Sequence, residues 1–279
     1  MTVDDAIDLP AFLELLDIEE LDRDLYRAKN PQPTTRAVLY GGQVASQALR
    51  AAALTVTEGF LPHSLHGYFL RPGQVHRPTI LRVNRDRDGR SFCARHVVAL
   101  QDARVILSLS VSFHLPEDGV EDESRPAPLV LAPEKLMAPD ATSVLGDWMK
   151  IFDFRLMPEI APESSTGANT APTRMWIRTK SPIGDDPILH ACVLTYASDF
   201  SSGFGDRGLP IEPPSGGPSL DHSLWLHRAL DVEDWFLLDL EPLITAGGRG
   251  LYGGAIYDRH GRRCASLTQE LLTRFPRSG

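Results

Sequence analysis

The chain has 279 residues, of which 42% are hydrophobic and 23% are charged, and its formal net charge is −9. This composition predicts a globular protein with a sizeable core, and the acidic balance argues against nucleic acid as a partner, because no basic stripe could neutralise phosphates. No apolar run is long enough to insert in a membrane, and the N-terminus lacks the apolar core of a signal peptide. Cys93, Cys192 and Cys264 lie far apart in apolar runs, as buried thiols in a reducing compartment do, so we expect a cytoplasmic protein.

The first half of the chain predicts a helix followed by four strands. A short amphipathic helix over 10–17 and a strand over 22–29 come first. A helix rich in small residues then extends from Gly42 to Val56, and small side chains let such a helix pack closely on a sheet. Turn signals such as Asp88-Gly89 separate four expected strands, over 64–73, 79–86, 90–101 and 104–114.

Gly41 and Gly42 stand at the start of that helix. The first N–H groups of a helix have no partner within the helix, and glycine leaves them accessible. We therefore expect these two residues to form a cradle for an anion or an oxyanion.

The second half predicts the same pattern after a connector. Residues 116–139 are rich in proline and acidic residues and show no periodicity, so they connect the halves as a solvated segment. A helix is expected over 185–200, with strands over 149–156, 174–180, 219–228, 235–246, 249–258 and 263–275.

The helix over 185–200 is the most informative element. Asp186 and Pro187 are a helix start signal, and the following residues are apolar on all sides, which predicts a buried helix. Asp199 at its end must then be hydrogen-bonded, paired or functional, because an unpartnered buried charge is costly. A capping role is the structural alternative, although an aspartate at a helix C-terminus opposes the helix dipole.

A helix and an antiparallel sheet therefore occur twice, and short sequence similarities support a duplication: HGYFLR at 66–71 with HSLWLH at 222–227, and DARVILSLS at 102–110 with GRRCASLTQ at 261–269. We expect an α+β double hotdog whose halves pack as a pseudo-dimer. The expected parts are an N-terminal hotdog over 1–115, a connector over 116–147 and a C-terminal hotdog over 148–279 that carries the catalytic residues.

Three polar residues of the second half lack counterparts in the first. Asp199 ends the buried helix, where the first helix has only alanines and Leu54; Ser219 begins a strand. Gln269 interrupts the last strand, at a place that we assign to Ser110 in the first half. A carboxylate, a hydroxyl and an amide can hold one water, with the carboxylate taking its proton. Asp221 and His222 beside Ser219 do not make a serine triad, since neighbouring strand residues face opposite ways and no GxSxG motif is present.

Six segments resemble the type II acyl-CoA thioesterases, the TesB-like family of double hotdog enzymes: LYGGQVASQAL, HGYFLRPG, DGRSFCARHVVALQ, LTYASDF, LDHSLWLHR and SLTQE. The resemblance covers nearly the whole chain. It implies hydrolysis of fatty acyl-CoA to free acid and CoA without metal or cofactor, and a water held by Asp199, Ser219 and Gln269. The family's usual threonine is Ser219 here, which keeps the hydroxyl. Fused hotdogs of this kind commonly associate, so we also expect a homo-oligomer.

Two other functions stay open at the level of sequence. A hotdog enoyl-CoA hydratase or dehydratase would need an Asp–His pair, for which His222 is the nearby candidate. A non-catalytic acyl-CoA-binding protein would keep the fold without turnover. The GxGxxG match at 248–253 precedes a strand and not a helix, so it does not predict a dinucleotide site.

Overall fold

The computed structural model describes residues 9–30, 38–138, 151–158, 172–200 and 217–274. Its helices are α1 Leu9–Leu16, α2 Gly41–Ala53 and α3 Pro187–Ser198, with a short 3-10 helix over Pro133–Lys135. Its strands are β1 Glu19–Asp22, β2 Leu25–Ala28, β3 Leu61–Phe69, β4 Thr79–Asp88, β5 Phe92–Gln101, β6 Arg104–His114, β7 Phe152–Leu156, β8 Thr173–Thr179, β9 Asp221–Leu226, β10 Phe236–Ala246, β11 Arg249–Asp258 and β12 Arg263–Leu272.

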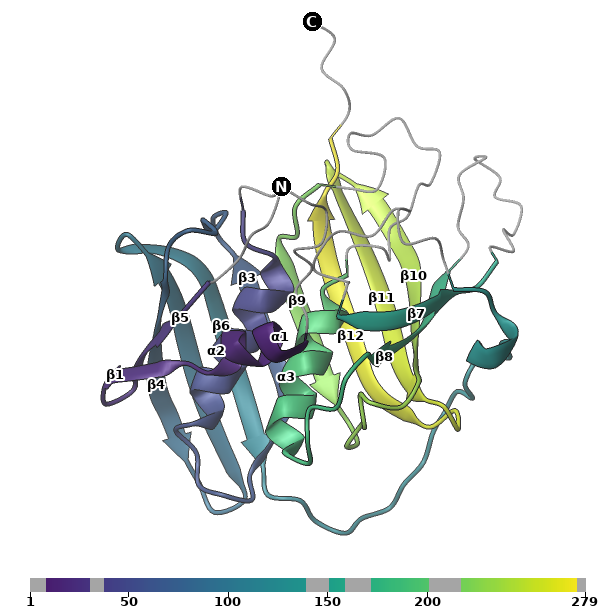
Figure 1. Cartoon of the computed structure of the whole chain (residues 1–279), viewed down its shortest axis with the longest axis horizontal. Helices are drawn as coiled ribbons and strands as arrows, with labels where there is room; N and C mark the ends of the chain where they lie inside the picture. The colour runs from purple at the N-terminus through teal and green to yellow at the C-terminus, as the bar shows by residue number, and fades with distance from the viewer. Residues whose placement is uncertain (1–8, 31–37, 139–150, 159–171, 201–216, 275–279) are drawn as a thin grey trace, which may run out of the picture.

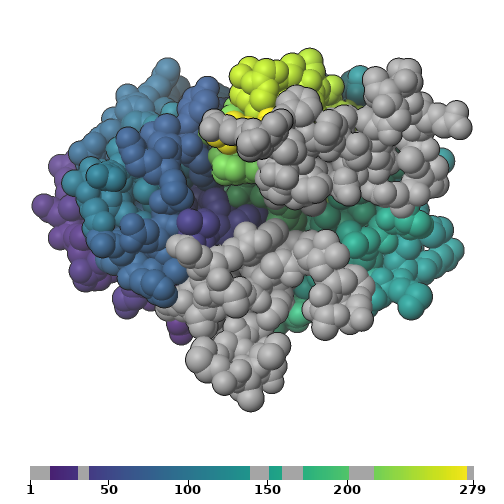
Figure 2. Space-filling model, turned by 90° about the horizontal axis from the view of Figure 1, so that it is seen from above, coloured from purple at the N-terminus to yellow at the C-terminus, as the bar shows by residue number. Residues whose placement is uncertain are grey.

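Two layers make up the molecule, a sheet and the helices that it wraps. Helices α2 and α3 lie side by side against the sheet, with strands of the first half beside α2 and strands of the second half beside α3 (Figure 1). Ser46 Oγ of α2 donates to the Cys192 carbonyl of α3 at 2.8 Å. The same division is visible from above, where the two halves occupy opposite sides of the molecule (Figure 2). This arrangement confirms the predicted α+β double hotdog.

The two halves share one continuous antiparallel sheet. Its twelve described strands run in the order β1-β2-β4-β5-β6-β3-β9-β12-β11-β10-β8-β7. Strands β3 and β9 pair at the centre, where Leu65 lies opposite Leu224. A meander in chain order would pair β3 with β4 and β9 with β10. Instead β3 pairs with β6 and β9, and β9 pairs with β12 and β3. Strand β3 therefore lies at the edge of the first half and β9 at the edge of the second, and the two halves pair through these two strands.

Most expected elements are present, with shifted ends. The strands over 104–114 and 249–258 have the predicted bounds. The strand predicted over 22–29 is instead a hairpin, β1 and β2, whose turn contains Asp24 in the left-handed region with φ 61°. Helix α2 ends at Ala53, before Val56, where the backbone N–H groups of Thr55 and Val56 bond carbonyls three residues back and the helix gives way to tight turns. The glycine- and proline-rich stretch 201–216, which the sequence indicates is a loop, lies outside the described residues.

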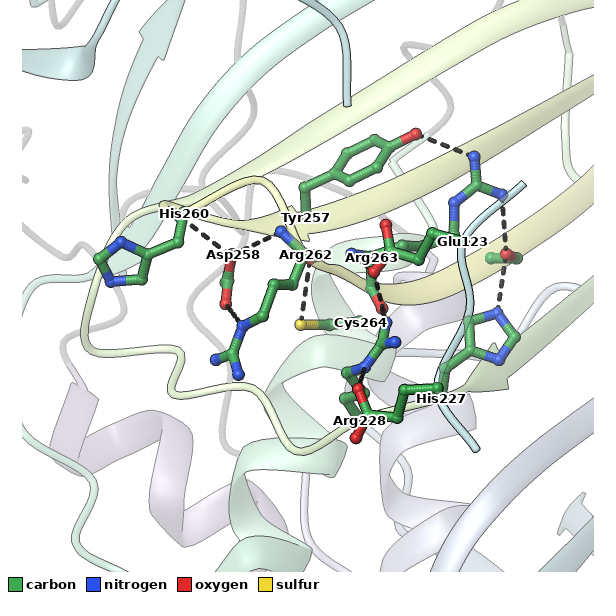
Figure 3. Close-up of polar contacts among 11 residues, drawn as sticks. Glu123, His227, Arg228, Tyr257, Asp258, His260, Arg262, Arg263 and Cys264 are labelled. Atoms are coloured by element: carbon green, nitrogen blue, oxygen red, sulfur yellow. Dashed lines mark hydrogen bonds and ion pairs between the residues drawn. The ribbon is translucent and has the colours of Figure 1, made fainter. Parts of the chain in front are cut away.

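The described part of the connector lies against the second half. Arg228 pairs with Glu123 at 2.7 Å and with Glu121 at 3.0 Å, and Glu123 also accepts the backbone N–H of Arg263 (Figure 3). Further along, Trp176 Nε1 donates to the Leu131 carbonyl at 2.8 Å. The connector is therefore solvated along its acidic stretch but anchored at particular residues.

Two further observations concern the environment of the chain. None of the helices in the described residues is long and apolar enough to cross a membrane. Cys93, Cys192 and Cys264 are buried free thiols. Burial raises the pKa of Cys192 to about 12 and that of Cys264 to about 11, so both remain protonated and unreactive at neutral pH.

Candidate active site

Asp199 is the C-cap residue of α3 and lies deep in the fold. The helix starts where the sequence predicts, since the Asp186 side chain accepts the Ile188 N–H and Pro187 occupies the first turn. Its C-terminal end is enclosed by α2, β3 and β9, so Asp199 is only 3% exposed. Burial raises the pKa of Asp199 from 3.8 to about 7; hydrogen bonds from Gln269, the Gly42 backbone and Ser219 act in the opposite direction. Asp199 therefore exchanges a proton close to neutral pH.

Gln269 and Ser219 lie beside this carboxylate. The Gln269 amide nitrogen donates to Asp199 Oδ1 at 2.7 Å and also to Ser219 Oγ. Ser219 forms an isolated bridge with Leu271 of β12, and its hydroxyl lies 3.5 Å from the same Asp199 oxygen. The three predicted residues thus come together, although they lie up to 70 positions apart in the chain.

The start of α2 reaches the same carboxylate from the other half of the molecule. The backbone N–H of Gly42 hydrogen-bonds Asp199. A Cβ on Gly41 would lie 2.6 Å from Asp199 Oδ2, and one on Gly42 would lie 2.5 Å from the Tyr196 carbonyl. Both positions are therefore glycine because the backbone of α2 approaches the end of α3 too closely for a side chain.

His222 belongs to the same cluster, although the sequence suggested it only for the hydratase alternative and not for the water site. It faces inward on β9, with 1% exposure, while Asp221 bonds the Glu270 N–H. Its Nδ1 lies 2.7 Å from Gln269 Oε1, and its Nε2 lies 2.8 Å from Ser198 Oγ. Its inward position could have been found from the sequence, because residues two apart on a strand face the same side and His222 lies two residues before the apolar Leu224.

The first half holds apolar residues at the corresponding places. Each half carries a β-bulge near the start of its last strand. The bulge of β6 lies opposite Ala99 and Leu100 of β5, and that of β12 lies opposite Ile256 and Tyr257 of β11. Aligning these bulges places Val111, which is 2% exposed, at the position of Gln269. The assignment of Ser110 was wrong by one residue. Ser110 is exposed on the outer face, since a slip of one residue moves a side chain to the other side of a sheet.

This cluster has the parts needed for proton abstraction from a water. It contains a carboxyl that ionises near neutrality, two polar side chains that orient it, and a helix N-terminus that favours negative charge. These groups come from α2, α3, β12 and the segment before β9, so the pseudo-dimer as a whole is required to assemble them.

The chain is similar to known proteins along almost its whole length. Residues 30–114 match the family model described as the acyl-CoA thioesterase N-terminal domain, and residues 116–273 match the acyl-CoA thioesterase C-terminal domain. Acyl-CoA thioesterase 2 of Haemophilus influenzae is 32% identical over 94% of this chain and 96% of its own length. Acyl-coenzyme A thioesterase 8 of Mus musculus is also 32% identical, over 94% and 88% respectively. The crystal structure of acyl-CoA thioesterase II TesB2 from Mycobacterium marinum is 34% identical, with a TM-score of 0.80 over 95% of this chain and 99% of that one.

Proposed function

Because this chain belongs to the type II acyl-CoA thioesterases and is an acyl-CoA thioester hydrolase, we propose that Asp199 is the general base that activates the hydrolytic water. The observation that carries the proposal is the Gln269 amide, whose nitrogen bonds both Asp199 Oδ1 and Ser219 Oγ. The Ser219 hydroxyl and Asp199 Oδ1 lie 3.5 Å apart beside this amide, and the proposal places the hydrolytic water against these two groups, which can hold and deprotonate it.

In this mechanism the water oxygen attacks the thioester carbonyl carbon while its proton passes to Asp199. The tetrahedral intermediate then collapses, the C–S bond breaks, and the CoA sulfur leaves with the proton that Asp199 took up. The products are the free fatty acid and CoA, and Asp199 returns to the ionised state. The residues of the chain supply the proton transfer and the orientation, so no covalent acyl-enzyme is required.

The start of α2 is the proposed oxyanion donor. The Gly42 N–H already bonds Asp199, so within the predicted pair the Gly41 N–H is the better candidate to receive the thioester oxygen. Preorganised donors of this kind contribute on the order of 3–4 kcal/mol to transition-state stabilisation. A complex with a non-hydrolysable acyl-CoA analogue tests this: a carbonyl beyond hydrogen-bond distance of both glycine nitrogens would remove them from the mechanism.

The alternative activity of a hydratase or dehydratase requires an Asp–His acid–base pair. Both ring nitrogens of His222 already contact other groups, Ser198 and Gln269, so the site does not present that pair. A non-catalytic acyl-CoA-binding role would not need an Asp199 whose pKa lies near 7. Thiol release compared with crotonyl-CoA hydration separates all three functions.

The mechanism is tested by substitution and by isotope labelling. Asp199→Asn keeps the shape but removes the proton acceptor, so kcat should fall roughly 10²–10⁴-fold. Ser219→Ala and Gln269→Ala should each cost less and should not add, because both side chains hold the same water. Ser219→Thr should stay active.

Single turnover in ¹⁸O water decides between water attack and a covalent route. We expect ¹⁸O in the released acid and an unmodified protein mass. An acyl adduct on Ser219 or Asp199, or ¹⁸O in the Asp199 carboxyl, would establish covalent catalysis and exclude the proposed mechanism.

A cytoplasmic location and a homo-oligomer belong to the same proposal. The buried free cysteines support a reducing compartment. Tyr68, Phe92 and Trp225 are 63%, 46% and 38% exposed, and exposed aromatic rings on strands of the central sheet support association between copies. Light scattering after size exclusion would test the assembly, and a monomer at micromolar concentration would contradict it.

A further inference from the structure

We propose that His222, supported by Ser198, is a positioning residue that fixes the Gln269 amide in the orientation required by the general base. The inference rests on the proposed function, because it concerns the same water site. Gln269 connects the two: its amide nitrogen lies 2.7 Å from Asp199 Oδ1, and its amide oxygen lies 2.7 Å from His222 Nδ1.

The direction of each hydrogen bond follows from what each group can donate. An ionised carboxylate only accepts, so Gln269 must present its nitrogen to Asp199 and its oxygen to His222. His222 Nδ1 must then carry a proton. Burial lowers the pKa of His222 to about 4, so the ring is neutral at pH 7 and its Nε2 is unprotonated. Ser198 Oγ lies 2.8 Å from this Nε2 and 3.0 Å from the Thr195 carbonyl, and in this tautomer of His222 its single proton is directed to Nε2.

This chain of bonds opposes a rotation that the catalytic cycle would otherwise favour. When Asp199 accepts the proton of the water, its carboxyl group can donate to an amide oxygen. A Gln269 amide turned by 180° would offer that oxygen, and its nitrogen would leave both Asp199 and Ser219. The same rotation would place the amide N–H groups against His222 Nδ1–H, donor against donor. His222 thus keeps the amide in place in both protonation states of Asp199.

Three further titratable groups lie near this cluster, Tyr252, His66 and Asp221. Burial raises the pKa of Tyr252, on β11, well above its ordinary value. Burial lowers the pKa of His66, on β3, and burial also dominates the raised pKa of Asp221 on β9. Gln269 bonds the Asp199 carboxyl directly, so a shift of the activity profile that disappears in the Gln269→Ala background reports on Asp199.

The test compares two substitutions of His222 by steady-state kinetics across pH. His222→Leu removes the donor, so kcat should fall roughly tenfold or more with KM within about twofold. The acidic limb of the profile should move to higher pH, because a loosely held Gln269 no longer lowers the pKa of Asp199. His222→Asn, whose amide N–H can take the place of Nδ1–H, should recover most of kcat and restore the limb.

His227→Leu is the matched control. That histidine follows the same strand and also contacts a serine, with Nε2 2.9 Å from Ser266 Oγ, but it is exposed. Its replacement should leave kcat and the profile unchanged. If His222→Leu does not fold, Ser198→Ala serves instead, because without the Ser198 hydroxyl the tautomer of His222 is no longer fixed. The acidic limb of the profile should again move to higher pH. An unmoved limb would overturn the proposal.

The double variant separates this inference from the mechanism that it supports. If His222 acts through Gln269, His222→Leu should cost nothing further in the Gln269→Ala background. Additive losses, or a His222→Leu enzyme with normal kcat, would overturn the positioning role even if Asp199→Asn is inactive. An active Asp199→Asn enzyme would instead overturn the proposed general base.

Discussion

Asp199 is a buried acid whose chemistry depends on a balance between burial and hydrogen bonding. Removal from water raises its pKa, while the Gln269 amide, the Gly42 N–H and the Ser219 hydroxyl stabilise the ionised form. The pKa of about 7 that results is suited to a general base, because the group is ionised often enough to accept a proton and basic enough to hold it.

The pH dependence of kcat should follow this group. Below about pH 7 Asp199 is protonated and cannot accept a proton from water, so kcat should fall tenfold per pH unit and should level off above pH 7. Gln269→Ala removes the largest of the opposing hydrogen bonds and should move the limb to higher pH. Initial rates measured at saturating acyl-CoA from pH 5 to 9 check this; a profile that is flat down to pH 5 would contradict it.

Folding stability should depend on the same ionisation. The folded state keeps the Asp199 proton up to about pH 7, whereas the unfolded chain releases it near 3.8. Stability is therefore lost as the pH rises from about 4 to 7, by up to about 4 kcal/mol in the limit set by these two values. Asp199→Asn lacks this ionisation, so its stability relative to the parent should increase over that range.

Urea unfolding at pH 5, 6 and 8 measures the difference. Asp118→Asn, a substitution on the exposed connector, is the control and should show no pH-dependent gain. An Asp199→Asn protein whose relative stability is the same at pH 5 and pH 8 would show that the carboxyl is not held with a raised pKa.

At the scale of elements, the site depends on where two helices meet. Asp199 sits at the C-terminal end of α3, which by itself disfavours a negative charge. The N-terminus of α2 lies against the same carboxylate, and its Gly42 N–H bonds it, so the favourable end of one helix offsets the unfavourable end of the other. This contact requires two residues without side chains.

Substitution of the two glycines should therefore affect different properties. Gly41→Ala would place a methyl group 2.6 Å from Asp199 Oδ2, so kcat should fall at least tenfold. Gly42→Ala would place it 2.5 Å from the rigid Tyr196 carbonyl, so the melting temperature should fall by several degrees, since overpacking costs roughly 1–3 kcal/mol. Gly119→Ala, which meets nothing within 4 Å, is the control. Wild-type kinetics in Gly41→Ala would contradict the close approach.

Across the whole molecule, particular residues show what the sequence could predict. Asp199, Ser219 and Gln269 could be found because each is a polar residue next to or within an apolar element. The position of β3 could not, because its pairing with β9 is a contact between halves that have similar patterns. His222 was not placed in the water site because its contact with Gln269 comes from the neighbouring strand. Ser110 was misplaced because β6 has two paired residues before its bulge, whereas β12 has one.

The duplicated fold should contain a single competent site. The first half has Val111 at the place of Gln269, and its strand partner Leu65 at the place of His222; both are buried and apolar. Helix α2 ends on Ala53, whereas α3 ends beside Asp199. None of these can hold a water or accept a proton. Calorimetric titration with a non-hydrolysable acyl-CoA analogue should therefore give one productive site per chain, and Asp199→Asn should remove the activity of the whole chain. Two equivalent sites, or half of the activity left in Asp199→Asn, would show that the first half is also catalytic.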